Sequence, residues 1–149
     1  MKSANHPFHH RSKLGSYYEI VLKPALELDM DRTLTKTAET TDTMDFVGKN
    51  CFVELKSRGD SYHYSQWFIK KDGWILPTCK LRRALEEYEK GNQVVFYYFW
   101  KADKTLWRWD FHPDCLNVIK NKYPEWHIDK QEQSYVPEDM WRKVVLRKC

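Results

Sequence analysis

The chain has 149 residues, of which 42% are hydrophobic and 31% charged, and its formal net charge is +4. This length is enough for one domain with a substantial core. No apolar segment approaches the roughly 20 residues that span a membrane, and the first residues lack the apolar core of a signal peptide. We therefore expect an intracellular protein whose mildly basic surface is compatible with nucleic acid.

The N-terminal part of the chain divides into an arm and the start of a domain. Residues 1–13 are polar and rich in histidine, which is typical of a flexible basic arm, and residues 14–149 form the predicted domain. Apolar side chains from Tyr17 to Leu28 predict a helix over residues 14–28 with a break or kink at Pro24. Residues 32–43 are rich in threonine and predict a strand or an extended loop.

A hairpin is predicted over residues 44–56. The turn signal Gly48-Lys49-Asn50 separates two apolar segments. If Lys49-Asn50 is the loop, the numbers of paired residues add up to 99 and Asp45 lies opposite Glu54. Cross-strand Cβ atoms are about 4.5–5.5 Å apart, a separation at which two carboxylates repel each other. A divalent cation between them would convert this repulsion into coordination.

Strand alternation places Glu54 and Lys56 on one face of the second strand, while Val53 and Leu55 point to the other face. Charged side chains on a short apolar strand must be paired or bound to a metal if they are buried. The alternative is a solvated face that carries a weak ion pair.

Two strands and a helix are predicted after the hairpin. Residues 62–70 and 74–76 have strand composition, and the helix covers residues 79–90, with Thr78 as its cap and Gly91 just past its end. Lys80 lies in the first turn of this helix, where a cation opposes the helix dipole unless an anion is near.

The rest of the domain begins with a strand at residues 93–100, whose continuous apolar run is typical of a central strand covered on both faces. A half-exposed antiparallel strand follows at residues 105–111. Its aromatic face is predicted to be core, with stacking of unpaired bases on Trp107 and Trp109 beside Arg108 as the alternative. Two short helices are expected at residues 116–123 and 138–146.

The four cysteines contain no CxxC pair, which argues against a zinc finger and favours free thiols. The segment from His112 to Cys115 is predicted to be a loop, with a pair of zinc ligands as the alternative. The chain also lacks a phosphate-binding glycine loop and the Ser-His-Asp order of a hydrolase triad.

Asp45, followed by Glu54-Leu55-Lys56 and Ser57-Arg58, resembles the PD-(D/E)xK nuclease superfamily in its small phage- or resolvase-like forms. The order of predicted elements over residues 14–111 is also similar. The chain departs from the family pattern at Met44, where proline is frequent, and in the short spacing from Asp45 to Glu54. The resemblance implies an α/β, restriction-endonuclease-like fold with a mixed central sheet flanked by helices. Residues 14–111 would form its core and residues 115–149 a C-terminal helical extension.

The resemblance also implies a set of site residues. Asp45, Glu54 and Lys56 would be catalytic, and Asp45, Glu54 and the backbone carbonyl of Leu55 would hold Mg²⁺ or Mn²⁺. Glu19 matches the place of an additional acidic ligand, with an exposed helix glutamate as the alternative. Arg58 and Lys80 are expected to contact nucleic acid.

The function implied is a metal-dependent endonuclease that hydrolyses phosphodiester bonds, with DNA, including branched or nicked forms, as the expected substrate. Junction resolvases of this kind act as homodimers, and their context would be the cytoplasm, a nucleoid or a site of viral replication. Two alternatives remain open. One is a non-catalytic nucleic-acid-binding module on the same fold. The other is a protein-interaction domain that uses the 15% aromatic content of the chain.

Overall fold

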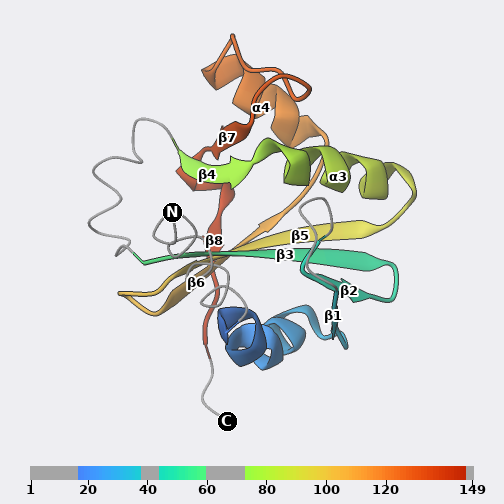
Figure 1. Ribbon diagram of the computed structural model, residues 1–149, viewed down its shortest axis with the longest axis vertical. Coiled ribbons are helices and arrows are strands. Elements are labelled where there is room, and N and C mark those ends of the chain that lie inside the picture. Colours follow the sequence, from blue (N-terminus) through green and yellow to red (C-terminus); the bar gives the residue numbers. More distant parts are fainter. Residues whose placement is uncertain (1–16, 38–43, 60–72, 147–149) are drawn as a thin grey trace, which may run out of the picture.

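The computed structural model describes residues 17–37, 44–59 and 73–146, which form a mixed α/β fold with three α-helices (Figure 1). The predicted arm at residues 1–13 and the predicted strand at residues 62–70 lie outside the described residues. No helix in the described ranges has the length and apolar character needed to cross a membrane. The elements are a helix at residues 17–30, β1 (Thr35–Lys36), β2 (Phe46–Gly48), β3 (Cys51–Arg58), β4 (Trp74–Pro77), α3 (Thr78–Glu89), β5 (Gln93–Trp100), β6 (Thr105–Asp110), α4 (Asp114–Lys122), β7 (Gln133–Val136), η1 (Glu138–Met140) and β8 (Arg142–Lys143).

The central sheet is mixed and has the strand order β1-β2-β3-β5-β6-β8. Strands β3 and β5 run parallel, and the other neighbours in this sheet are antiparallel. Strand β5 lies between β3 and β6 and is buried from Val94 to Trp100, which confirms the prediction of a central strand. Strands β4 and β7 form a second, two-stranded antiparallel sheet.

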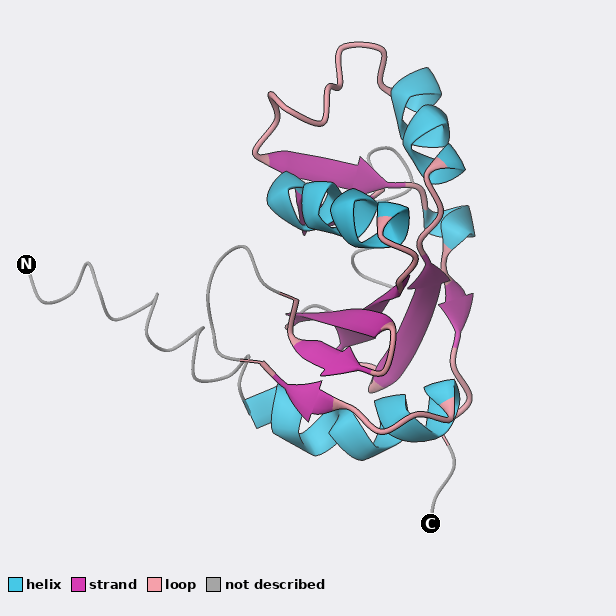
Figure 2. Cartoon of the chain, turned by 90° about the vertical axis from the view of Figure 1, so that its right-hand side faces the viewer, coloured by secondary structure: helices cyan, strands magenta, loops and turns pink. Residues whose placement is uncertain are grey.

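The two faces of the central sheet carry different layers (Figures 1 and 2). One face packs against the helix at residues 17–30 through Leu22, Leu26 and Met30. The other face packs against α3 and against β4 through Leu81, Trp74 and Leu76, with β7 and α4 further out. Residues between β3 and β5 in the chain include α3, so α3 belongs to the crossover that joins two parallel strands.

The helix at residues 17–30 presents a different stripe to the core from the one its sequence suggests. Leu22 and Leu26 are buried, whereas Tyr17, Ile20 and Leu28 are exposed. The helix also continues through Pro24. Core packing on both sides of Pro24 compensates for the backbone hydrogen bond that proline cannot donate.

The aromatic prediction for β6 is confirmed at Trp109, which is buried and stacks on Phe96. Trp107 is half-buried and meets Trp74 edge-on. The prediction that β6 is half-exposed is wrong, because Leu106 and Arg108 on its other face are also buried. The helix at residues 17–30 covers this face.

Two local predictions are also wrong. Thr78 is the first residue of α3 and not its cap; its hydroxyl instead pairs with the Ser134 hydroxyl at 2.6 Å. The helix expected at residues 138–146 is a short 3₁₀ turn followed by β8, which pairs with β6. The unpaired edge of β6 offers backbone donors and acceptors to β8, and this tertiary pairing overrides the local helical pattern.

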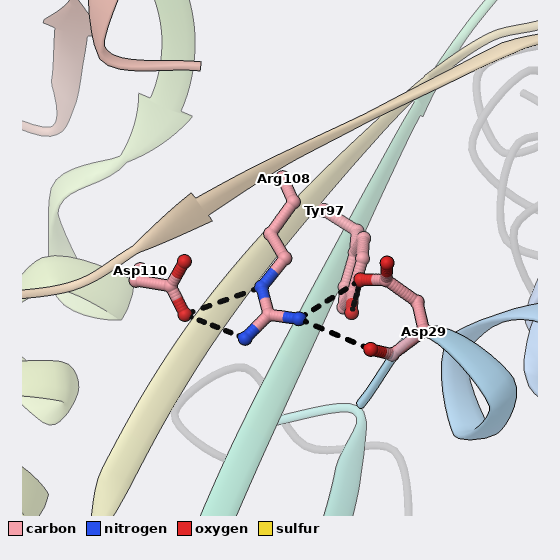
Figure 3. Close-up of polar contacts among 4 residues, drawn as sticks. All are labelled: Asp29, Tyr97, Arg108 and Asp110. Carbon is pink, nitrogen blue, oxygen red and sulfur yellow. Dashed lines mark hydrogen bonds and ion pairs between the residues drawn. The ribbon is translucent and has the colours of Figure 1, made fainter. Parts of the chain in front are cut away.

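An ionic cluster joins the helix at residues 17–30 to the sheet (Figure 3). The guanidinium of Arg108 donates to Asp29 Oδ2 at 2.9 Å through Nη1 and to Asp110 Oδ1 at 2.7 Å through Nη2. The hydroxyl of Tyr97 donates to the same Asp29 oxygen at 2.6 Å. Burial and the Asp29 hydrogen bond raise the pKa of Tyr97 above its usual range, so the phenol stays a donor. Asp29 lies in the last turn of its helix, where a cation is also favoured by the helix dipole.

We expect Arg108→Met to lower the free energy of unfolding by roughly 2–4 kcal/mol, because it leaves Asp29 with one buried donor fewer and no counterion. Urea denaturation at neutral pH measures this change. Asp110→Asn is the matched control: the Asp110 side chain is 51% exposed. Its loss should cost less than about 1 kcal/mol. Equal effects of the two substitutions would show that the Arg108–Asp29 pair does not stabilise the fold more than the Arg108–Asp110 pair does.

Candidate active site

The β2–β3 hairpin has the predicted register. Phe46 pairs with Val53, Val47 with Phe52, and Gly48 with Cys51, so the paired numbers add up to 99. Asn50 in the loop has a φ of 55°, a left-handed conformation that asparagine tolerates well. A Cβ atom on Gly48 would lie 2.9 Å from the Thr33 carbonyl oxygen, so this approach of the backbone requires glycine.

Asp45 directly precedes β2 and is linked to Glu54 and Leu55 by two hydrogen bonds between side chain and backbone. The Asp45 N–H donates to Glu54 Oε1 at 3.2 Å, and the Leu55 N–H donates to Asp45 Oδ2 at 2.8 Å. The backbone N–H of Thr37 donates to the Asp45 carbonyl at 2.9 Å and fixes this position. The structure therefore brings the two predicted carboxyl groups together at the open end of the hairpin.

Glu19 joins this pair from the helix at residues 17–30. The charge of Asp45 acts on its carboxyl group, and Lys36 Nζ on β1 lies 3.0 Å from Glu19 Oε2. The Glu19 side chain is only 12% exposed, so it is not the exposed helix glutamate of the alternative interpretation. It continues the buried stripe of Leu22 and Leu26 at helical spacing, a signal that the sequence contains.

Lys80 reaches the same cluster from α3, on the opposite side of the sheet from the helix at residues 17–30. Its Nζ lies 3.5 Å from Glu54 Oε1, and both side chains are 10% exposed. Glu54 is therefore the anion that offsets the unfavourable position of Lys80 in the first turn of α3. The pairing of Lys36 with Glu19 was not anticipated, and we find no local signal in the sequence that points to it.

The remaining predicted residues lie along β3. Lys56 is half-buried, and its Cα partner on β5 is Tyr98, in the same alternating set as Glu54 and its partner Phe96. Leu55 is buried on the other face with Val53. Arg58, at the end of β3, places its guanidinium carbon 5.7 Å from the centre of the Trp100 ring. Their roles in binding or catalysis remain predictions.

The three carboxyl groups hold their protons more tightly than usual. Burial, with the charge of Asp45, raises the pKa of Glu19 to about 7. Burial, with the charge of Glu54, raises the pKa of Asp45 to about 7. Burial also raises the pKa of Glu54 to about 7, against the opposing effect of Lys80. Like charges gathered out of water are unfavourable, and a cation relieves this cost.

The donor set fits a hard divalent cation in its chemistry. Carboxylate and carbonyl oxygens with water are the ligands that Mg²⁺ and Mn²⁺ prefer. Among the described residues, no group of three or more His, Cys, Asp or Glu side chains has the arrangement of a formed metal centre. The ligand set expected from the sequence is smaller, because it needs only Asp45, Glu54 and the Leu55 carbonyl, with water in the other positions.

Comparison with known proteins finds no matching family model, no matching curated protein and no matching solved structure.

The raised pKa values predict how the stability of the metal-free protein depends on pH. Ordinary carboxyl values are 4.5 for Glu and 3.8 for Asp, so an unfolded chain releases these protons at lower pH than the folded protein does. The free energy of unfolding should therefore fall as the pH rises from about 4 to about 7 and change little above this range. Urea denaturation in EDTA across pH 4–8.5 measures this slope.

Asp45→Asn should flatten the slope and, at the alkaline end, make the metal-free protein more stable than the wild type by roughly 1–2 kcal/mol, because one of three like charges is gone. Glu86→Gln is the control, since Glu86 is exposed on α3. A slope that is the same in the wild type and in Asp45→Asn would contradict a raised pKa at Asp45.

Proposed function

We propose that this protein is a metal-dependent endonuclease that hydrolyses phosphodiester bonds, with DNA as its substrate. The single observation that carries the proposal is the contact between Asp45 and Glu54, with the Asp45 N–H on Glu54 Oε1 and the Leu55 N–H on Asp45 Oδ2. Lys56 follows on the same face of β3. A metal-dependent phosphodiesterase uses an acidic site for the cation beside a basic group for the phosphate, and these residues would supply both.

Each residue has an expected role. Asp45 and Glu54 would hold Mg²⁺ or Mn²⁺ together with the Leu55 carbonyl, and Glu19 would add an acidic group through Asp45. When bound, the metal supplies a water of lowered pKa and neutralises charge on the phosphate. Lys56 would orient the attacking water and stabilise the negative charge that develops on the phosphate oxygens. Arg58 would contact the nucleic-acid backbone.

The fold supports the same proposal at a coarser level. The mixed sheet has an antiparallel hairpin at β2–β3 and a parallel neighbour at β5, and α3 belongs to the crossover between β3 and β5. We propose that this arrangement is a restriction-endonuclease-like core. The last β-strand pairing, of β8 with β6, and the β4–β7 sheet would then be additions of this chain.

We expect Glu54→Gln and Asp45→Asn to reduce cleavage on the order of 10²–10³-fold, because each removes a charge that would hold the cation. Labelled linear, supercoiled, branched and single-stranded nucleic acids, incubated with Mg²⁺, Mn²⁺ or EDTA, measure this loss and identify the substrate. Lys56→Ala should remove turnover but keep metal binding. Cleavage should be absent in EDTA.

Glu86→Gln serves as the matched control, because it removes an exposed carboxylate from α3. Circular dichroism must show that each variant is folded. If Glu54→Gln cleaves like the wild type, the site assignment is wrong. Salt-sensitive binding to DNA without cleavage under any metal would instead favour the non-catalytic nucleic-acid-binding module.

The proposed homodimer has its own test. Tyr17, Ile20, Val21 and Leu28 form an exposed apolar strip on the helix at residues 17–30, and Val145 is exposed as well. Burial of such a strip would drive the association of two copies. We expect wild-type protein to sediment as a dimer and Ile20→Asp as a folded monomer. A wild-type monomer at all concentrations would reject the dimer and leave the nuclease proposal intact.

A further inference from the structure

Lys80 occupies a position that is unfavourable for a lysine by local criteria. It is the third residue of α3, a helix with no side-chain cap and no acidic residue in its first turn. The positive end of the helix dipole repels a cation there. Lys80 is also buried, with 8% of the residue exposed, so water solvates its ammonium group poorly. A compensating anion must therefore account for the position.

Glu54 is that anion. Lys80 Nζ lies 3.5 Å from Glu54 Oε1, the same oxygen that accepts the N–H of Asp45. The lysine therefore lies against the carboxylate oxygen that links Glu54 to Asp45. It reaches this oxygen from α3, whereas Asp45 and Glu54 both belong to the hairpin.

Charge balance in the cluster depends on Lys80. Three carboxyl groups, of Glu19, Asp45 and Glu54, lie with two lysines, Lys36 and Lys80, each paired with one of the glutamates. When all five side chains are ionised, they carry one net negative charge. A divalent cation added to this set would leave it positive. A metal at Glu54 Oε1 and the ammonium of Lys80 on the same oxygen would repel each other and therefore compete for it.

We propose that Lys80 is a built-in counterion of Glu54 that competes with the divalent cation and thereby sets the metal affinity of the site. This inference rests on the proposed function, because it concerns the same acidic cluster. In the metal-free protein, Lys80 compensates the buried carboxylate. When the metal binds, the ammonium leaves Glu54. Lys80 is thus a positioning residue, distinct in its effect from Lys56.

The test compares Mn²⁺ binding by wild type, Lys80→Gln, Lys80→Arg and Lys90→Gln, measured by electron paramagnetic resonance of free Mn²⁺ at pH 8. Glutamine can donate to Glu54 without a charge, so Lys80→Gln should bind Mn²⁺ on the order of tenfold more tightly than wild type. Lys80→Arg keeps the cation and should bind Mn²⁺ as wild type or more weakly. Lys90 is 65% exposed near the other end of α3, and Lys90→Gln should leave the affinity unchanged.

A purely structural role for Lys80 gives the opposite sign, because a disturbed site binds metal more weakly. Unchanged or weaker Mn²⁺ binding by Lys80→Gln therefore overturns the inference. If Lys80→Gln folds only when Mn²⁺ is added, the metal has replaced the lysine as counterion, which supports it. If Lys80→Gln does not fold in either condition, the neutral variant Lys80→Met takes its place: tighter Mn²⁺ binding than wild type supports the inference, and unchanged or weaker binding overturns it.

The outcomes separate this inference from the proposed function. Metal-dependent cleavage by wild type without tighter binding by Lys80→Gln rejects the role of Lys80 alone. Tighter binding by Lys80→Gln without cleavage by wild type rejects the nuclease and keeps the counterion. Mn²⁺ binding that Glu54→Gln does not change places the metal elsewhere and rejects both.

Discussion

The removal of Glu54 from water is the constraint on which the candidate site depends. A carboxylate that is 8% exposed beside a second carboxylate must obtain its compensation from the protein. Glu54 obtains it from the N–H of Asp45 in the hairpin and from Lys80 on α3. The neighbouring carboxyl groups are compensated in the same way, Asp45 by the N–H of Leu55 and Glu19 by Lys36 on β1. Elements that are distant in the sequence therefore converge on this point, each with a charge or a donor.

This convergence requires that the layers on both faces of the sheet keep their positions. Glu19 comes from the helix on one face and Lys80 from α3 on the other. The Arg108 cluster fixes the end of the first helix through Asp29, ten residues beyond Glu19 and about 15 Å along the axis. Buried aromatic side chains around Trp74 fill the space between the sheet and β4. Rigid packing at these two places holds Glu19 and Lys80 in reach of the hairpin.

The sequence is sufficient where the determining interactions are local. The loop Lys49-Asn50 sets the register of β2 and β3, so the contact between Asp45 and Glu54 followed from a turn signal and a period of two. Partners distant along the chain could not be found in this way. Lys80 meets Glu54 across 26 positions, β8 pairs with β6, and Ser134 takes the hydroxyl of Thr78 that was expected to cap α3. These contacts depend on how the layers pack, which a local pattern does not encode.

The burial of the acidic cluster also bears on which class of ligand it suits. A protein partner recognises exposed side chains, and an interface gains little from carboxylates that are about 10% exposed and already paired with lysines of the same domain. Carboxyl oxygens are the ligands that a small hard cation prefers, and a cation needs no exposed surface to bind them. The exposed apolar strip on the first helix offers a surface to a macromolecule, whereas Glu19 on the same helix is turned toward the acidic cluster. A chain that uses both would bind its cation inside the domain and its partner outside, so the carboxylates could be optimised for the cation alone.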